Sequence, residues 1–130
     1  MTLATCLLII YLAGGEAIEF HLAYGNAEKL EEFLHAPESL KEEGIVVPIA
    51  RPGERSFCHA KGKVFLFFIN DSGRISREPF PLPEKKIIIL PPTDAVYAVF
   101  AKPSKKLKEI KGGEAVQIMR LETKEKEGML

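Results

Sequence analysis

Cys58 and His59 are neighbours whose side-chain types could do chemistry together. A histidine beside a cysteine lowers the pKa of the thiol and can produce a nucleophilic thiolate, so a catalytic thiolate at Cys58 is one interpretation. Adjacent residues on a strand point to opposite faces, however, and residues 56–60 have the composition of a strand. We therefore expect Cys58, like Cys6, to be a buried structural thiol, and a disulfide between the two stays open.

The same residue types do not form a metal-binding pattern. Cys6 and Cys58 lie 52 residues apart, and His21, His35 and His59 are scattered along the chain. Structural and catalytic zinc sites place at least two ligands close together in the sequence. The sequence therefore predicts neither a metal site nor a cofactor.

Basic residues gather between Lys102 and Lys111, where five lysines occur in ten residues. The whole chain nevertheless has 18 basic and 18 acidic residues, so no global field attracts it to nucleic acid. The zero net charge hides an acidic segment, residues 16–44, with eight Glu against two Lys. No aromatic residues alternate with the five lysines to stack on bases. We expect them to form the solvated face of a helix, with nucleic-acid binding as an alternative.

Length and composition indicate one globular domain. The chain has 130 residues, of which 46% are apolar, and it is rich in Glu and Lys with one Gln and two Asn, a skew typical of hyperthermophile proteins. Residues 1–122 are expected to form the domain and residues 123–130 a polar tail.

The apolar run Leu3–Ala13 has eleven residues, against about 20 for a membrane span, and no basic residue precedes it. We interpret this run as a buried strand, with a cleaved signal as the alternative, and expect a cytoplasmic protein without a membrane partner.

The hydrophobic pattern predicts eight or nine short strands and two short helices. Strands are expected near residues 3–13, 17–23, 45–50, 56–60, 64–70, 87–90, 96–101 and 115–121, and helices near 26–34 and 103–110. Gly and Pro punctuate these segments, as in a β-sandwich or a barrel. A closed barrel would also leave no exposed edge strand.

Three segments, in this order, resemble the cyclophilin fold: Gly15–Leu22 with the helix after it, Gly62–Ile69 with its double Phe, and Val96–Lys102 with the Lys105–Glu114 segment. The sequence is most similar to compact prokaryotic cyclophilin-like proteins, whose function is not settled. The resemblance implies a mainly β (α+β) fold, a closed eight-stranded barrel with two short capping helices.

The resemblance also implies a ligand site on the outer wall of the barrel. Phe68 matches a pocket phenylalanine, Cys58 within Ser56–His59 matches a pocket alanine, and Tyr97 stands where the family has a histidine. The family's catalytic Arg, Gln and Trp motifs have no counterpart, and Arg51 and Arg55 match no motif. The predicted ligand-binding residues are Arg51, Arg55, Phe57, Cys58, His59, Phe68 and Tyr97.

These residues favour a small binding module for a peptide or a small molecule, with catalysis lost. A prolyl cis-trans isomerase with a reorganised site is the enzymatic alternative, although the loss of a transition-state donor typically lowers a rate by about 10²–10³-fold. Core packing is the competing interpretation for the phenylalanines, because alternation sends Phe65 and Phe67 to one face and Phe68 to the other. The sequence indicates neither the ligand nor the oligomeric state.

Overall fold

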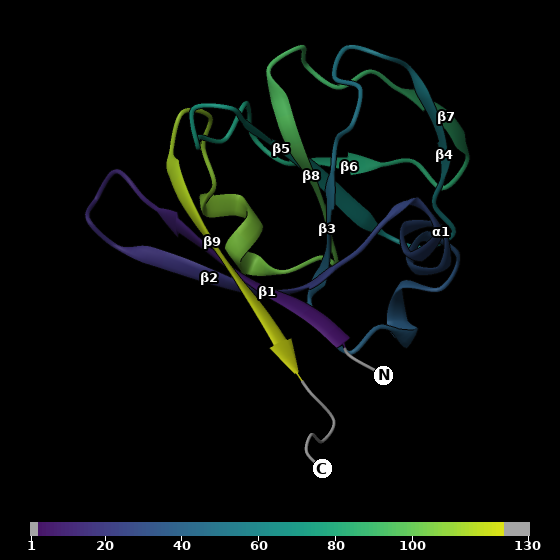
Figure 1. Ribbon diagram of the computed structural model, residues 1–130, viewed down its shortest axis with the longest axis horizontal. Coiled ribbons are helices and arrows are strands. Elements are labelled where there is room, and N and C mark those ends of the chain that lie inside the picture. Colours follow the sequence, from purple (N-terminus) through teal and green to yellow (C-terminus); the bar gives the residue numbers. More distant parts are fainter. Residues whose placement is uncertain (1–2, 124–130) are drawn as a thin grey trace.

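The computed structural model describes residues 3–123, which form two β-sheets, one α-helix and two short 3₁₀ helices (Figure 1). The strands are β1 (Leu3–Tyr11), β2 (Ala17–Tyr24), β3 (Gly44–Pro48), β4 (Ser56–His59), β5 (Val64–Asn70), β6 (Phe80–Leu82), β7 (Lys86–Ile89), β8 (Ala95–Ala101) and β9 (Ala115–Thr123). The helices are α1 (Ala27–His35), η1 (Pro37–Ser39) and η2 (Lys105–Glu109). Seven strands form a mixed sheet in the order β6-β5-β8-β3-β2-β1-β9, and β4 pairs with β7 in a separate ribbon.

The uncharged N-terminal run forms β1, which lies between β2 and β9. A hairpin joins β1 to β2, with Tyr11 opposite Ala17 and Thr5 opposite Ala23. Gly15 has a φ of 92°, a left-handed conformation that favours glycine in such a turn. The predicted strand over residues 3–13 is confirmed, with its end at Tyr11.

Helix α1 follows β2 and begins where the sequence predicts. The Asn26 side-chain oxygen accepts a hydrogen bond of 3.0 Å from the backbone N–H of Lys29, which satisfies one of the free donors of the first turn. Phe33 and Leu34 on one face are buried, while the glutamates face solvent. Pro37 then begins the short helix η1, so α1 ends after nine residues.

Strand β3 joins the two halves of the main sheet, parallel to β2 and antiparallel to β8. It starts at Gly44, where a Cβ atom would lie 2.2 Å from the backbone oxygen of Phe100. Only glycine therefore permits this close approach of β3 to β8.

Two hydrophobic clusters occupy the two faces of strands β3, β5 and β8. One cluster packs Phe67, Ile69 and Val99 against β1, β2 and η2. The other packs Phe68 and Phe100 against α1 and the β4–β7 ribbon. The predicted alternation along β5, with Phe65 and Phe67 on one face and Phe68 on the other, is confirmed.

The predicted closed eight-stranded barrel is wrong, because the main sheet is open. One edge strand, β6, has three residues and contains Pro81, which has no backbone N–H to offer a further strand. The other edge strand, β9, pairs with β1 and approaches the far end of the sheet through one isolated bridge, Arg74 to Ala115. Two segments that a barrel would have used, β4 and β7, pair with each other instead.

The prediction of a second capping helix is also wrong, since α1 is the single α-helix of residues 3–123. Residues 105–109 form the 3₁₀ helix η2, whose turn closes with a bond from the Leu107 N–H to the Ser104 oxygen. Ile110 already has an extended backbone, and Gly112 and Gly113 follow. The five residues of η2, which lie between Pro103 and these glycines, are too few for a stable α-helix.

Residues 124–130, most of the predicted polar tail, lie outside the described residues, and Thr123 is the last residue of β9. Within the described part of the chain, none of the helices has the length and apolar character needed to cross a bilayer.

Candidate ligand-binding pocket

A pocket of about 740 Å³ lies between the main sheet, α1 and the β4–β7 ribbon. The sheet contributes Phe68 from β5 and Ala98 and Phe100 from β8 to its lining. The helix contributes Leu30 and Leu34, which are four residues apart and therefore lie on one helical face. Figure 1 shows α1 and the ribbon at the same side of the molecule, away from β1, β2 and β9.

The pocket exists because short elements cover this face of the sheet. The ribbon has two strands of four residues each, and α1 has nine residues. Strand β3 contributes Val47 and Pro48, and connecting segments complete the lining with Ile49, Ala50 and Pro91. The lining is mainly apolar, so this pocket offers desolvation to an apolar group rather than a network of polar contacts.

Five of the seven residues predicted from the sequence line this pocket: Arg51, Arg55, Cys58, His59 and Phe68. Phe57 lies in β4 opposite Ile88, and its side chain is not among those described. Tyr97 is not brought to the pocket. Because Phe68 pairs with Ala98, the next residue back along β8, Tyr97, faces the other cluster of the core.

The geometry of β4 argues against a nucleophilic cysteine. Cys58 is buried, whereas the neighbouring His59 is exposed, as expected for adjacent residues on a strand. Burial raises the pKa of the Cys58 thiol, so the thiol is protonated at neutral pH. Cys6 and Cys58 are not joined by a disulfide, and they belong to different core clusters.

Charged side chains surround the apolar lining. Arg51, Arg55 and Lys86 contribute positive charge, and Glu31 and Glu54 contribute negative charge. Arg51 lies 3.6 Å from Glu54 in an ion pair in which both side chains are well exposed. Such an exposed pair contributes little to stability. Within residues 3–123 there is no cluster of three acidic, His or Cys side chains that could hold a metal ion.

Sequence reasoning missed the half of the pocket that comes from α1, β3 and β7. Leu30 and Leu34 lie at helical spacing, but nothing in that spacing distinguishes a pocket wall from a filled core. Lys86 and Ile89 reach the pocket through the pairing of β7 with β4. That pairing joins segments nearly 30 residues apart, and no local pattern signals it.

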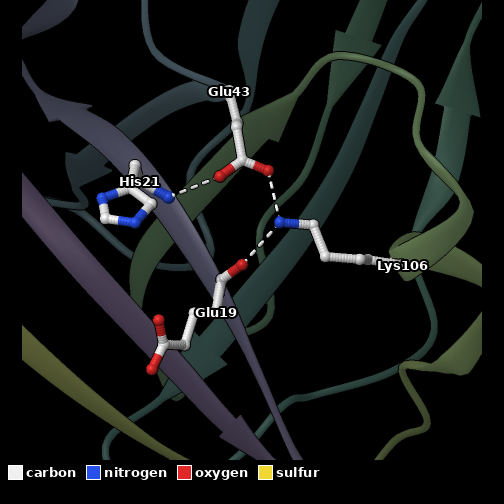
Figure 2. Close-up of polar contacts among 4 residues, drawn as sticks. All are labelled: Glu19, His21, Glu43 and Lys106. Carbon is white, nitrogen blue, oxygen red and sulfur yellow. Dashed lines mark hydrogen bonds and ion pairs between the residues drawn. The ribbon is translucent and has the colours of Figure 1, made fainter.

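A second group of polar side chains lies between β2, β3 and η2 (Figure 2). The Lys106 ammonium donates to a Glu43 carboxylate oxygen and, over 2.6 Å, to the backbone oxygen of Glu19. The other Glu43 oxygen accepts a 2.8 Å bond from the backbone N–H of His21. The ammonium also lies 4.4 Å from the ring centroid of Phe20.

This group serves to hold η2 against the sheet. Burial of Glu43 by itself raises its pKa, but the hydrogen bonds from the His21 N–H and the Lys106 ammonium outweigh burial and lower the pKa. Both carboxylate oxygens and the ammonium already have partners within the protein. The arrangement therefore supplies neither a general base nor a vacant position for a ligand.

The predicted basic face is smaller than the sequence indicates. Lys106 is held by Glu43, and Lys102 donates to the backbone oxygen of Leu40. Lys111 lies 3.8 Å from Glu78 in an exposed ion pair. Lys105 and Lys108 are exposed at one edge of a smaller groove near η2. Nucleic-acid binding through residues 102–111 stays a prediction. Lys102 and Lys106 already bind protein groups, so they contribute less to an attraction for phosphates.

Comparisons with known proteins place the fold among solved structures. The chain matches no family model and no curated protein. It is similar to a protein of Sinorhizobium meliloti 1021 described as a "putative transcription regulator", with a TM-score of 0.62 and 13% identity over 90% of this chain and 93% of the other. It is also similar to a protein of unknown function from Novosphingobium aromaticivorans DSM 12444, with a TM-score of 0.59 and 15% identity over 85% and 83% of the two chains.

At these identities the likeness concerns the fold alone. It spans most of both of these proteins, so this chain shares its overall fold with them. Neither of these two proteins is described as a cyclophilin, and the main sheet of this chain is open. The cyclophilin-like barrel expected from the sequence is therefore wrong. The segments that suggested it are short apolar strands, which buried sheets of many folds contain.

Proposed function

We propose that this protein is a binding module for a small organic molecule with a largely apolar body, held in the pocket between the main sheet, α1 and the β4–β7 ribbon. The observation that carries the proposal is the pocket itself. Its volume of about 740 Å³ falls within the range of about 300–1,000 Å³ that is typical of small-molecule sites, and its lining is mainly apolar.

The lining favours binding without chemistry. Burial raises the pKa of the Cys58 thiol, so this potential nucleophile of the pocket is protonated at neutral pH. An acid–base catalyst or a nucleophile usually shows a shift toward its working form. A prolyl isomerase stays the enzymatic alternative, with Arg51 and Arg55 as its candidate donors.

Cys6 and Cys58 are buried thiols without a disulfide, which is consistent with a reducing compartment, and a cytoplasmic location is part of the proposal. By analogy with the Sinorhizobium meliloti protein, the bound molecule could be sensed as a regulatory signal. The binding proposal does not depend on this analogy.

A fluorescence titration with N-phenyl-1-naphthylamine, an uncharged dye that brightens in apolar surroundings, tests the proposal. Saturable binding of one dye per chain is expected. Ala50 is exposed at the pocket, so Ala50→Trp would fill it with little strain and weaken binding by at least about tenfold. Ala13→Trp, an exposed position in the β1–β2 turn, is the matched control and should bind like the parent protein.

Absence of saturable binding, or equal weakening in both variants, would refute the proposal. An isomerase assay on an X-Pro peptide addresses the alternative. Acceleration above background that is lost in Arg51→Ala or Arg55→Ala would replace the binding module with an enzyme.

A further inference from the structure

The pocket is chemically asymmetric. Its sheet and helix walls are formed by aliphatic and aromatic side chains, Leu34, Phe68, Ala98 and Phe100, all of them buried. The segment between β3 and β4 instead brings two arginines, Arg51 and Arg55, to the lining. A ligand that occupies the pocket therefore meets apolar surface over most of its body and guanidinium groups along one segment.

The two arginines differ in what they already bind. Arg51 shares its charge with Glu54 at 3.6 Å. Arg55 makes no hydrogen bond or ion pair with any residue of the described range 3–123, and it is exposed to solvent at the pocket. Of the charges at this site, the Arg55 guanidinium is thus available to a ligand without first breaking a protein contact.

The lining carries more basic than acidic side chains. Arg51, Arg55 and Lys86 are basic, Glu31 and Glu54 are acidic, and Arg51 already shares its charge with Glu54. Glu31 belongs to the α1 wall, whereas Arg55 precedes β4. A guanidinium presents paired N–H donors that match the two oxygens of a carboxylate or the oxygens of a phosphate.

We infer that the ligand of this pocket is an amphipathic anion, with an apolar body against the sheet and α1 and an oxyanion head group bound by Arg55. This inference rests on the proposed function and specifies its ligand class. Charge attraction at an exposed arginine is modest in water, so selectivity for the anion should be about three- to tenfold rather than absolute.

Ten-carbon amphiphiles that differ in their head groups test the inference. Decanoate, decanol and decylamine would each displace N-phenyl-1-naphthylamine from the pocket. We expect decanoate to bind about three- to tenfold more tightly than decanol and decylamine to bind most weakly. Decyl phosphate, compared with decanoate, then shows which oxyanion the site prefers, and raised salt should reduce the preference for either anion.

Variants of Arg55 connect the preference to one side chain. Arg55→Gln should abolish the difference between decanoate and decanol while leaving decanol binding unchanged, and Arg55→Lys should retain part of it. Arg77→Gln, an exposed arginine that does not line the pocket, is the matched control and should keep the full preference.

The outcomes separate the inference from the proposal beneath it. If the three head groups bind equally, or if Arg55→Gln weakens decanol as much as decanoate, the anion inference is overturned while the apolar pocket stands. If neither the dye nor any amphiphile binds the parent protein, both are overturned.

Discussion

The two faces of strands β3, β5 and β8 are covered in contrasting ways. On one face, the long strands β1 and β2 and the helix η2 fold over the sheet, and Phe67 and Val99 are fully buried between them. On the other face, α1 and the four-residue strands of the β4–β7 ribbon cover the sheet incompletely, and a pocket remains. Long strands can fill the space above a sheet, whereas short, separately paired elements leave room for a ligand.

Polar contacts reinforce the same contrast. Lys106 links η2 to β2 and β3 through Glu43 and the Glu19 oxygen, so the filled face is also tied together by hydrogen bonds (Figure 2). At the pocket, the ion pair between Arg51 and Glu54 joins residues three apart in one exposed segment and links no separate elements. We therefore expect the filled face to determine stability and the pocket face to determine binding.

The largest expected effect comes from two neighbouring phenylalanines on β5. Phe67→Ala should destabilise the protein by about 3–5 kcal/mol, because it leaves a cavity in a filled core. Phe68→Ala should cost roughly 1.5–3 kcal/mol, because the pocket already adjoins this side chain and little new cavity forms. Urea unfolding measures both values.

Dye binding should also distinguish Phe67 from Phe68. Phe68→Ala should weaken N-phenyl-1-naphthylamine binding, whereas Phe67→Ala should not. If an alanine variant does not fold, Phe67→Leu and Phe68→Leu should show the same order with smaller differences. Equal losses of stability at the two positions would show that the two faces do not differ as proposed.

A smaller effect concerns the polar contacts of the filled face. Glu43→Gln should lower stability by about 1 kcal/mol at neutral pH, a value that allows for the partial exposure of the ion pair. The pKa of Glu43 is lowered in the folded protein, so its contribution is complete above the unfolded value of about 4.3 and is lost as the pH falls through the folded value. The difference between the variant and the parent protein should therefore vanish in acid.

Chemical unfolding at neutral and acidic pH measures this difference. Glu84→Gln, an exposed position in the segment between β6 and β7, is the matched control and should show no such pH dependence. A Glu43→Gln variant whose loss of stability persists unchanged in acid would show that shape, rather than charge, holds η2.

The sequence allowed the local structure to be predicted better than the pairing of distant segments. Alternation along residues 64–70 correctly assigned Phe67 and Phe68 to opposite faces, because side-chain direction in a strand has a period of two. The separate β4–β7 ribbon could not be predicted, because its pairing depends on which strands reach each other in space.

The candidate site shows the same limit at the level of single residues. Phe68 and Tyr97 were expected in one pocket, yet Phe68 pairs with Ala98, and Tyr97 therefore faces the other core cluster. A shift of register by one residue would have reversed that outcome, and register is set by contacts between strands that the sequence of each strand does not contain.

The smallest effect is one of reactivity, and it compares the two cysteines. Cys58 lines the pocket and Cys6 is enclosed in the filled cluster, so iodoacetamide should modify Cys58 first. Because burial raises the pKa of Cys58, its modification near pH 8 should be at least about tenfold slower than that of an exposed thiol and should accelerate as the pH rises.

Peptide mapping by mass spectrometry assigns each product, and decanoate should slow the reaction of Cys58 by occupying the pocket. Modification of Cys6 at the same rate as Cys58 would mean that reagent enters by unfolding of the whole domain, and then the pocket would not be the accessible side of the sheet.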